Sequence, residues 1–221
     1  MLVTLTIACA VATLALIAAE IKGNDRIRAL AKFMASGAFV MIGLEAFHVS
    51  EAARPFATCI FVGLVLGAIG DIALLGRSNA AFMAGLVAFL GGHIMYVVAA
   101  AQVLPIEAWP SAAGAFAVIP IAAAGIALFA WLWPHLGALR IPVIVYVIAI
   151  AMMVVAAIAV ARGHALPEPQ RCLFLIGAVL FFISDFAVAR DKFIKRGNNR
   201  IWGLPSYFAG QLLIAWTLIG L

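Results

Sequence analysis

Residues 56–75 read FATCIFVGLVLGAIGDIALL, an apolar run in which Asp71 is the only charged residue. About 20 predominantly apolar residues are what an α-helix needs to cross the hydrocarbon core of a bilayer. An ionisable side chain is costly in hydrocarbon, and it usually faces a bundle interior or a cavity. This stretch therefore predicts a transmembrane helix that carries a functional carboxylate near one end.

The whole chain has the same character, because 67% of its 221 residues are hydrophobic and only 10% are charged. Such a composition is typical of integral membrane proteins. The apolar runs have helical length and lack the alternation of a β-barrel. We expect an all-α polytopic bundle of eight transmembrane helices, one integral membrane domain over residues 1–221. The predicted spans are residues 2–20, 30–47, 56–75, 80–101, 112–133, 141–161, 172–189 and 203–220.

Lys and Arg are distributed unevenly among the connections. Cytoplasmic loops are enriched in these residues, so the side with eleven of them is predicted to be cytoplasmic. Both termini are then predicted to lie on the non-cytoplasmic side of the membrane, which we expect to be a bacterial inner membrane. The net charge of +5 follows from this orientation and gives no indication of nucleic-acid binding. The eleven are Lys22, Arg26, Arg28, Lys32, Arg77, Arg140, Arg190, Lys192, Lys195, Arg196 and Arg200, and the opposite connections hold Arg54, Arg162 and Arg171.

The first span resembles a signal peptide in its apolar character. It has no basic region before the apolar run, and the run continues to Glu20. These features predict a retained first helix.

A second aspartate, Asp185, lies in a similar setting. The sequences Ile69-Gly-Asp-Ile-Ala73 and Ile183-Ser-Asp-Phe-Ala187 share a pattern. Both lie at the predicted cytoplasmic ends of spans that are four helices apart. This is the arrangement that a parallel repeat of two four-helix halves would produce.

Small residues also mark one face of the third span. Gly63, Gly67 and Gly70 allow a neighbouring helix to approach closely. Asp71 lies near this face on a helical wheel, so its side chain is predicted to point into the bundle. Ser78 and Asn79 are predicted caps of the fourth span.

The rise of about 1.5 Å per residue gives the depth of each polar side chain. Asp71 and Asp185 both lie about one turn from the inner ends of their spans. Other polar groups are predicted at or near this level, and together they would line one cavity open toward the cytoplasmic half. They are Lys32, Tyr146, Ser184, Tyr207 and Gln211.

His93 and Tyr96 in the fourth span are predicted to lie deeper, about 20 Å from its inner end. They join the cavity only if that helix begins later or tilts. Simpler roles compete for several of these residues. Tyr146 and Gln211 would serve as hydrogen bonds between helices, His93 as a structural hydrogen-bonding group, and Lys32 as a side chain that extends to the interface.

Two carboxylates in a partly dry site repel each other's ionised forms, so one proton is shared or one group is neutral. Such a pair supplies an acid and a base for hydrolysis. Zinc chemistry is disfavoured, because three of the four histidines lie in or near loops. There is also no Gly-x-Ser-x-Gly elbow and no Gly-Lys-Ser/Thr phosphate loop.

A larger set of residues resembles the YhhN/lysoplasmalogenase family. The resemblance covers the second to eighth spans, and the sequence departs from the family at Lys32-Phe33, where Lys-Pro is common. The set comprises Gly70-Asp71, Leu74-Leu75, Phe82, Gly85, Phe89, His93 and Tyr96, then Arg140, Pro142 and Tyr146, then Gly177-Ala178, Phe181, Ser184-Asp185 and Phe193, and finally Tyr207 and Gln211.

The resemblance implies an eight-helix membrane hydrolase that cleaves the vinyl ether bond of a lysophospholipid substrate, the lysoplasmalogen. It implies Asp71 and Asp185 as the catalytic residues, and no metal or organic cofactor. One aspartate would protonate the vinyl ether and the other would activate water, with Asp185 preferred as the acid. Tyr146, Tyr207 and Gln211 would orient water or the glycerol hydroxyl, and Lys32 would hold the phosphate.

Two other classes compete with this hydrolase. A small proton-coupled transporter would use paired aspartates to relay protons, and a lipid-binding membrane protein would perform no chemistry. The polar residues gather toward one side of the bundle, which favours the enzyme. The sequence leaves the oligomeric state open.

Overall fold

The computed structural model describes residues 1–195 and 197–221, so Arg196, one of the eleven basic residues above, lies outside the described part. Over the described residues the chain folds into α-helices joined by short connections. The helices are α1 Leu2–Lys22, α2 Asp25–Gly43, α3 Arg54–Ala73, α4 Asn79–Val103, α5 Trp109–Ala113, α6 Ala115–Leu132, α7 Arg140–Arg162, α8 Glu168–Ala189 and α9 Asn199–Trp216.

Local sequence explains where several helices begin and end. Gly23 ends α1 in the left-handed conformation, with φ of 66°, which glycine adopts without steric cost. The Asn24 side chain accepts from the Ile27 amide at 3.1 Å and caps α2. The predicted cap of α4 is confirmed at Ser78, whose hydroxyl accepts from the Ala81 amide at 3.0 Å.

Four predicted spans have clearly different limits in the structure. The second, residues 30–47, is α2, which begins at Asp25 and ends at Gly43, and the eighth, residues 203–220, is α9, which begins at Asn199 and ends at Trp216. The fifth, residues 112–133, is divided at Gly114, whose φ of 74° ends the short α5 before α6 begins. The seventh, residues 172–189, was predicted too short, because α8 begins at Glu168 and continues past Ala189 into a π-helical turn, Arg190–Ile194. This extension changes the depth of Asp185.

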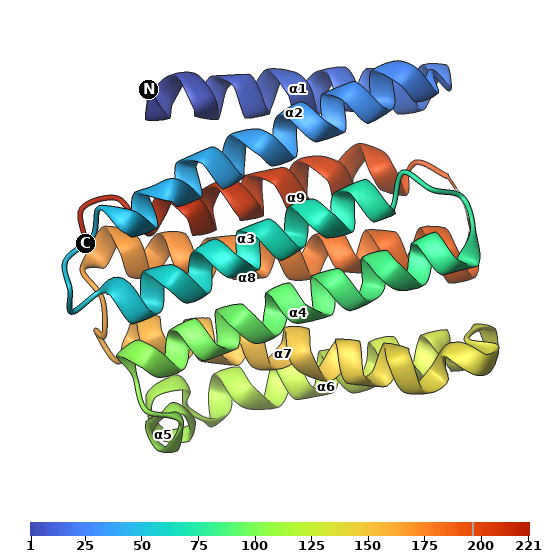
Figure 1. Ribbon diagram of the computed structural model, residues 1–221. Helices are drawn as coiled ribbons and strands as arrows, with labels where there is room; N and C mark the ends of the chain where they lie inside the picture. Colours follow the sequence, from blue (N-terminus) through green and yellow to red (C-terminus); the bar gives the residue numbers. More distant parts are fainter. Residues whose placement is uncertain (196) are drawn as a thin grey trace.

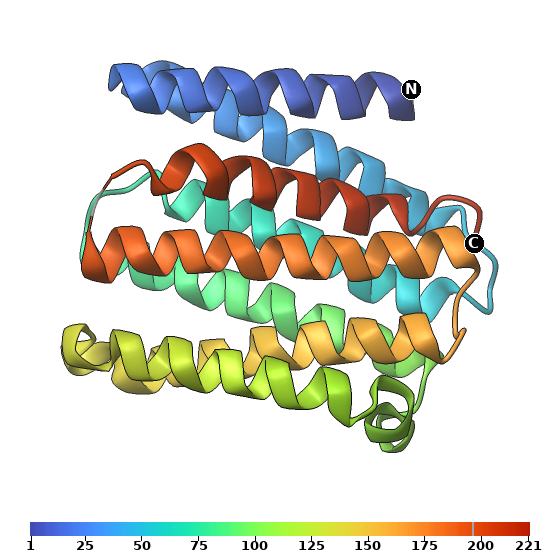
Figure 2. The same ribbon diagram turned by 180° about the vertical axis from the view of Figure 1, so that it is seen from behind.

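The long helices run side by side along one direction (Figures 1 and 2). Helices α2, α3 and α4 form one layer, and α8 and α9 form the facing layer. Contacts of α7 with α4 and α8, and of α2 with α9, close these layers into a ring. Helix α1 packs on α2 and α9, and α6 packs on α7. The ring creates the interior into which polar side chains can point.

Small residues bring α3 close to α4 and α8 close to α9, in the same register. A Cβ at Gly92 would lie 3.3 Å from the carbonyl oxygen of Gly63, and a Cβ at Gly210 would lie 2.9 Å from that of Gly177. Both pairs thus approach through their backbones. The helix contacts recur too, since α2–α3, α3–α4 and α4–α7 correspond to α7–α8, α8–α9 and α9–α2. This recurrence supports the hypothesis of two four-helix halves.

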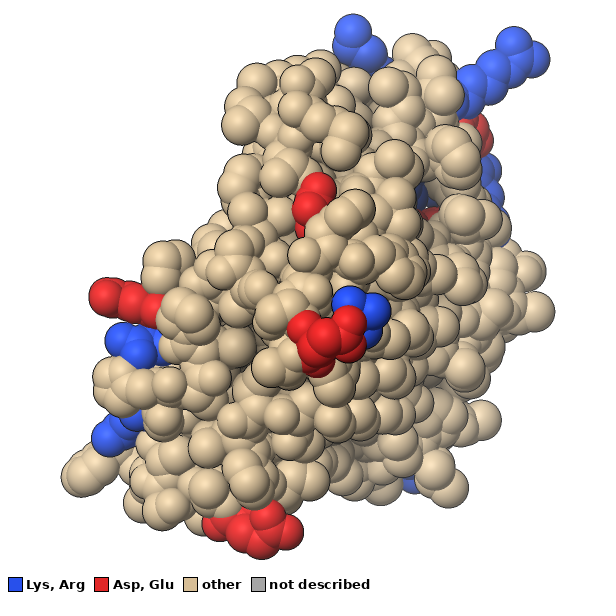
Figure 3. Space-filling model, turned by 60° about the vertical axis from the view of Figure 1, so that its left-hand side comes forward, with Lys and Arg blue, Asp and Glu red and all other residues tan. Residues whose placement is uncertain are grey.

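The surface is that of an integral membrane protein. Uncharged side chains cover most of the face in Figure 3, and the charged ones stand singly or in small groups. Among the described residues, seven helices are long and apolar enough to cross a membrane. The eighth long helix, α9, is not among them, and its sequence includes the polar residues Asn199, Arg200 and Gln211. The predicted count of eight is therefore approximate. Both termini lie at the same end of the bundle (Figure 1).

Candidate active site

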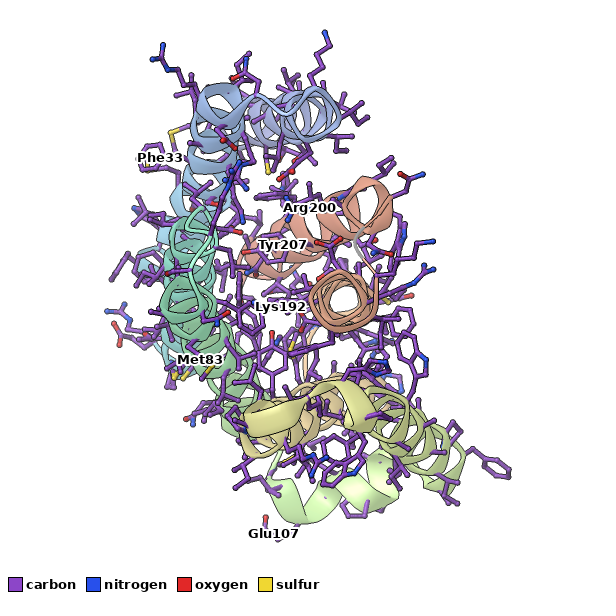
Figure 4. The ribbon with its side chains drawn as sticks, turned by 90° about the vertical axis from the view of Figure 1, so that its right-hand side faces the viewer. Phe33, Met83, Glu107, Lys192, Arg200 and Tyr207 are labelled. Atoms are coloured by element: carbon purple, nitrogen blue, oxygen red, sulfur yellow. The ribbon has the colours of Figure 1, made fainter. Side chains whose placement is uncertain are left out.

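A cavity of about 570 Å³ enters the bundle at the end that holds the α1–α2, α3–α4 and α8–α9 connections. Asp71 and Asp185 both line this cavity, as do Lys32, Tyr146, Ser184 and Tyr207. The site prediction depended on the two aspartates facing one space, and the structure places them so. Figure 4 views the bundle from this end, with Tyr207 toward its centre and Phe33 at its outer edge.

Asp71 lies at the centre of a fully engaged polar cluster. Asp71 is 2% exposed, and the Lys32 ammonium lies 3.1 Å from its Oδ1. Oδ2 accepts hydrogen bonds from the Ser36 hydroxyl at 2.6 Å and the Tyr207 hydroxyl at 2.8 Å. Two donors and a cation around one carboxyl group form an environment suited to a carboxylate.

Three helices supply this cluster. Lys32 and Ser36 are four residues apart on α2, so they share one helical face. The face of α3 that carries Gly67 packs tightly against α9, because a Cβ at Gly67 would lie 3.3 Å from the Tyr207 hydroxyl. The predicted orientation of Asp71, beside the glycine face and into the bundle, is confirmed.

Asp185 belongs to a second cluster with a different character. The Tyr146 hydroxyl donates to Oδ2 at 2.9 Å, and His93 Nε2 lies 3.0 Å from the same oxygen. His93 Nε2 is also 3.0 Å from the Tyr146 hydroxyl, so the three groups form a triangle. Among the described residues, no hydrogen bond to Oδ1 of Asp185 is present. The Asp185 side chain is 17% exposed, against 3% for Asp71, and it keeps one oxygen free at the cavity.

Met153 indicates which nitrogen of the His93 ring carries hydrogen. Its sulfur lies 3.3 Å from His93 Nδ1, and a thioether only accepts hydrogen bonds. The contact therefore assigns a hydrogen to Nδ1. In the neutral ring Nε2 then carries no hydrogen, so it accepts a hydrogen bond, and the donor is the hydroxyl of Tyr146 or a protonated Asp185. The triangle is built to hold a transferable proton next to Asp185.

His93 meets Asp185 because the latter lies deeper than predicted. Asp185 is nine residues before Ile194, where the helical segment ends. At the α-helical rise this is about 13 Å, and the prediction placed Asp185 about one turn from that end. The expectation of equal depth for the two aspartates, measured from their helix ends, was wrong for this reason.

Some predicted residues lie behind the cavity surface. His93, Tyr96 and Gln211 are each 0% exposed and do not line the cavity. Tyr96 donates to Gln211 Oε1 at 2.7 Å, and Gln211 Nε2 donates to the Tyr207 hydroxyl at 3.3 Å. This chain supports Asp71 from α4 through α9. For Gln211 the structure thus shows the hydrogen bonds between helices that were the simpler alternative.

Two other predicted residues differ in their contacts. The Ser184 hydroxyl donates to the Phe181 carbonyl on its own helix, at 2.8 Å. The Lys32 side chain forms an ion pair with Asp71, and the residue is 8% exposed. It does not extend to the interface.

Aromatic rings separate the two aspartate clusters. The Phe181 ring lies 4.5 Å from the His93 ring and 5.2 Å from the Tyr207 ring, measured between centroids. Phe89 packs against Phe181 and Tyr207 and lines the cavity. Phe181 therefore packs against His93 of one cluster and Tyr207 of the other.

Sequence reasoning missed Ser36, Met153 and Phe181 as parts of the site. Ser36 carried a signal, because it follows Lys32 by one helical turn. Phe181 also carried one, because it belongs to the set that resembles the family, although no role was assigned to it. Met153 carried none, since a single apolar residue in an apolar helix is usually core.

The fold and site define a class of protein: a polytopic α-helical membrane protein with two buried aspartate clusters on one cavity. Among the described residues, no three His, Cys, Asp or Glu side chains come together as a metal-binding group. The YhhN family model matches residues 27–218, and the chain belongs to this family. The match covers every element that contributes to the two clusters.

Curated relatives include the lysoplasmalogenases of Mycobacterium bovis and Mycobacterium tuberculosis, each 38% identical over 159 residues. These alignments cover 68% of this chain and 56% of each relative, so the chain spans little more than half of their length. The human lysoplasmalogenase TMEM86A is 32% identical over 178 residues, which cover 76% of this chain and 68% of that protein. No solved structure gives a significant match.

Proposed function

We propose that this protein is a membrane hydrolase that cleaves the vinyl ether bond of lysoplasmalogens. The observation that carries the proposal is one cavity lined by two aspartates with opposite surroundings. Asp71 has both oxygens engaged, one with the Lys32 cation. Asp185 has a free oxygen and a proton-holding triangle behind it. The names of the curated relatives support the substrate class.

The chemistry of the substrate matches this asymmetry. Protonation of the β-carbon of a vinyl ether gives an oxocarbenium ion, and water then adds to the adjacent carbon. The resulting hemiacetal collapses to a fatty aldehyde and a glycerophospho-base. Asp185 acts as the acid, and the Tyr146–His93 pair holds its carboxyl group in place. Asp71, held as a carboxylate, stabilises the cation and accepts a proton from the attacking water. When the hemiacetal collapses, Asp71 gives this proton to the leaving glycerol oxygen and Asp185 takes the proton of the hemiacetal hydroxyl group, so both carboxyl groups return to their starting states.

The cavity also has apolar walls for a hydrocarbon chain. Val147 and Ile150 follow Tyr146 on α7, and Leu128 on α6 and Phe182 on α8 line the same space. A lysolipid would place its vinyl ether between the aspartates and its chain along this wall. Most basic residues lie at the cavity end of the bundle, which supports a cytoplasmic opening with both termini on the other side of a bacterial inner membrane.

Purified protein incubated with lysoplasmenylethanolamine in detergent micelles should release fatty aldehyde. Asp71→Asn and Asp185→Asn should each lower turnover by at least about 100-fold, the range of a general acid or base. Glu107→Gln is the matched control, because this exposed acidic residue lies outside the cavity. Turnover that survives in both aspartate variants would contradict the mechanism. Aspartate-dependent hydrolysis of a different lysolipid would retain the site and replace the substrate.

A further inference from the structure

The mouth of the cavity carries a ring of charged side chains, most of which neutralise one another. Glu20 pairs with Arg200 at 2.6 Å and with Arg28 at 3.8 Å. Asp25 pairs with Arg77 at 2.7 Å and with Arg28 at 3.4 Å. The third carboxylate of this ring, Asp191, lies 3.3 Å from Arg200. All of these residues line the cavity.

Lys192 is the exception in this ring. It lines the cavity, and among the described residues no carboxylate lies within ion-pair distance of its ammonium. Nζ donates to the amide oxygen of Asn79 at 3.3 Å and lies 4.4 Å from the centroid of the Phe82 ring. Both partners are on α4, so they hold Lys192 across the gap between α8 and α4. Figure 4 shows Lys192 on the side of α8 that faces this gap.

The place of Lys192 relative to the candidate acid is fixed by the helix. Lys192 follows Asp185 by seven residues, in a segment that is helical to Ile194. Both residues line the cavity, and seven residues of helix separate them by about 10 Å along the axis. In a lysoplasmalogen one glycerol unit separates the vinyl ether from the phosphate. The reach of a lysine side chain closes the remaining gap.

We propose that Lys192 binds the phosphate of a lysophospholipid headgroup at the mouth of the cavity. The inference rests on the proposed function for the position of the vinyl ether. A singly charged phosphodiester supplies the anion that this ring lacks, because its other cations already face Glu20, Asp25 or Asp191. A flexible lysine binds such a group as a point charge. The phosphate role predicted for Lys32 passes to Lys192, because the charge of Lys32 is matched by Asp71.

Binding can be measured without catalysis. A saturated 1-O-alkyl lysophosphatidylethanolamine keeps the headgroup and lacks the vinyl ether, and 1-O-alkylglycerol lacks the phosphate as well. The dissociation constant of each would be measured by titration in micelles at fixed detergent concentration. Lys192→Ala should weaken binding of the phospholipid analogue roughly tenfold, the size expected for one charge-assisted hydrogen bond. Binding of the alkylglycerol should be unchanged.

Two further variants separate charge from structure. Lys192→Arg should restore phospholipid binding to within a few-fold of the unaltered protein. Lys195→Ala is the matched control, because Lys195 is exposed and does not line the cavity. Equal weakening of both ligands in Lys192→Ala, or no weakening of either, would overturn the proposal. Inorganic phosphate should compete poorly with the analogue, and competition equal to that of glycerophosphoethanolamine would identify a free-phosphate site instead.

The binding measurement remains informative whatever the enzyme assay gives. A Lys192-dependent preference for the phosphorylated analogue, without aldehyde release from lysoplasmenylethanolamine, would retain the headgroup site and reject the hydrolase. Aldehyde release with no effect of Lys192→Ala on the KM would retain the hydrolase and reject the headgroup site.

Discussion

The ion pair between Lys32 and Asp71 provides the sharpest test of the site geometry. Lys32→Met keeps the length of the side chain and removes its charge. The two residues are 8% and 2% exposed, and their charged atoms are 3.1 Å apart. At an effective dielectric constant of about 20, two charges at this distance attract by about 5 kcal/mol. Ser36 and Tyr207 still donate to Asp71, so part of this loss is compensated.

We expect Lys32→Met to lower the free energy of unfolding by about 3 kcal/mol, the lower part of the range for a buried ion pair that loses one partner. The double variant Lys32→Met/Asp71→Asn also removes the carboxylate charge that Lys32→Met leaves without a cation. The amide oxygen introduced at position 71 still accepts hydrogen bonds from Ser36 and Tyr207. It should recover at least about half of the loss. Reversible denaturant unfolding in micelles, followed by tryptophan fluorescence, measures both values.

Lys22→Met is the matched control, because Lys22 is exposed at the end of α1. Its effect should stay within about 0.5 kcal/mol. A single Lys32→Met variant as stable as the unaltered protein would refute the ion pair. So would a double variant whose loss equals the sum of the two single losses, because charges in contact must couple.

Three further predictions concern the second cluster, the helix contacts and the topology. Tyr146→Phe removes the hydroxyl that donates to the α8 carboxylate, so turnover should fall about tenfold to 100-fold, while unfolding free energy changes by only about 1 kcal/mol. Gly210→Ala places a Cβ 2.9 Å from the Gly177 carbonyl oxygen and should cost about 1–3 kcal/mol, whereas Gly37→Ala, with no atom within 4 Å, should be neutral or stabilising. A reporter that works only in the cytoplasm should be inactive when it is fused after Leu221. An active reporter would mean that the C-terminus is cytoplasmic and that the topology is the reverse of the predicted one.

Much of the fold was predictable because each apolar run is long enough to be recognised in the sequence as a membrane-spanning helix. A helix in hydrocarbon satisfies its own backbone groups, so an apolar run of membrane length specifies its own conformation. The glycine face of α3 similarly predicted that Asp71 points inward. The ends of the spans were less predictable. Nothing in residues 190–194 distinguishes a loop from the π-helical turn that continues α8.

The pairing of side chains between helices was not predictable, because it depends on rotation, tilt and depth. His93 illustrates this. Its depth on α4 was estimated from its position, but the depth of its partner Asp185 was measured from Ala189, whereas the helical segment continues past α8 to Ile194. Gln211 was predicted at the cavity, yet it lies behind the cavity surface. Ser184 does line the cavity, but its hydroxyl donates to the Phe181 carbonyl on its own helix.

The sequence by itself determined that the chain is a membrane bundle and that two aspartates are its most costly residues. Composition and span length suffice for the first, and the energetic cost of a carboxylate in hydrocarbon suffices for the second. Only the tertiary structure decided that the aspartates share a cavity and differ in their surroundings. Lys32 reaches Asp71 from α2, and His93 reaches Asp185 from α4. Those partners are brought together by helix packing, which no single span encodes.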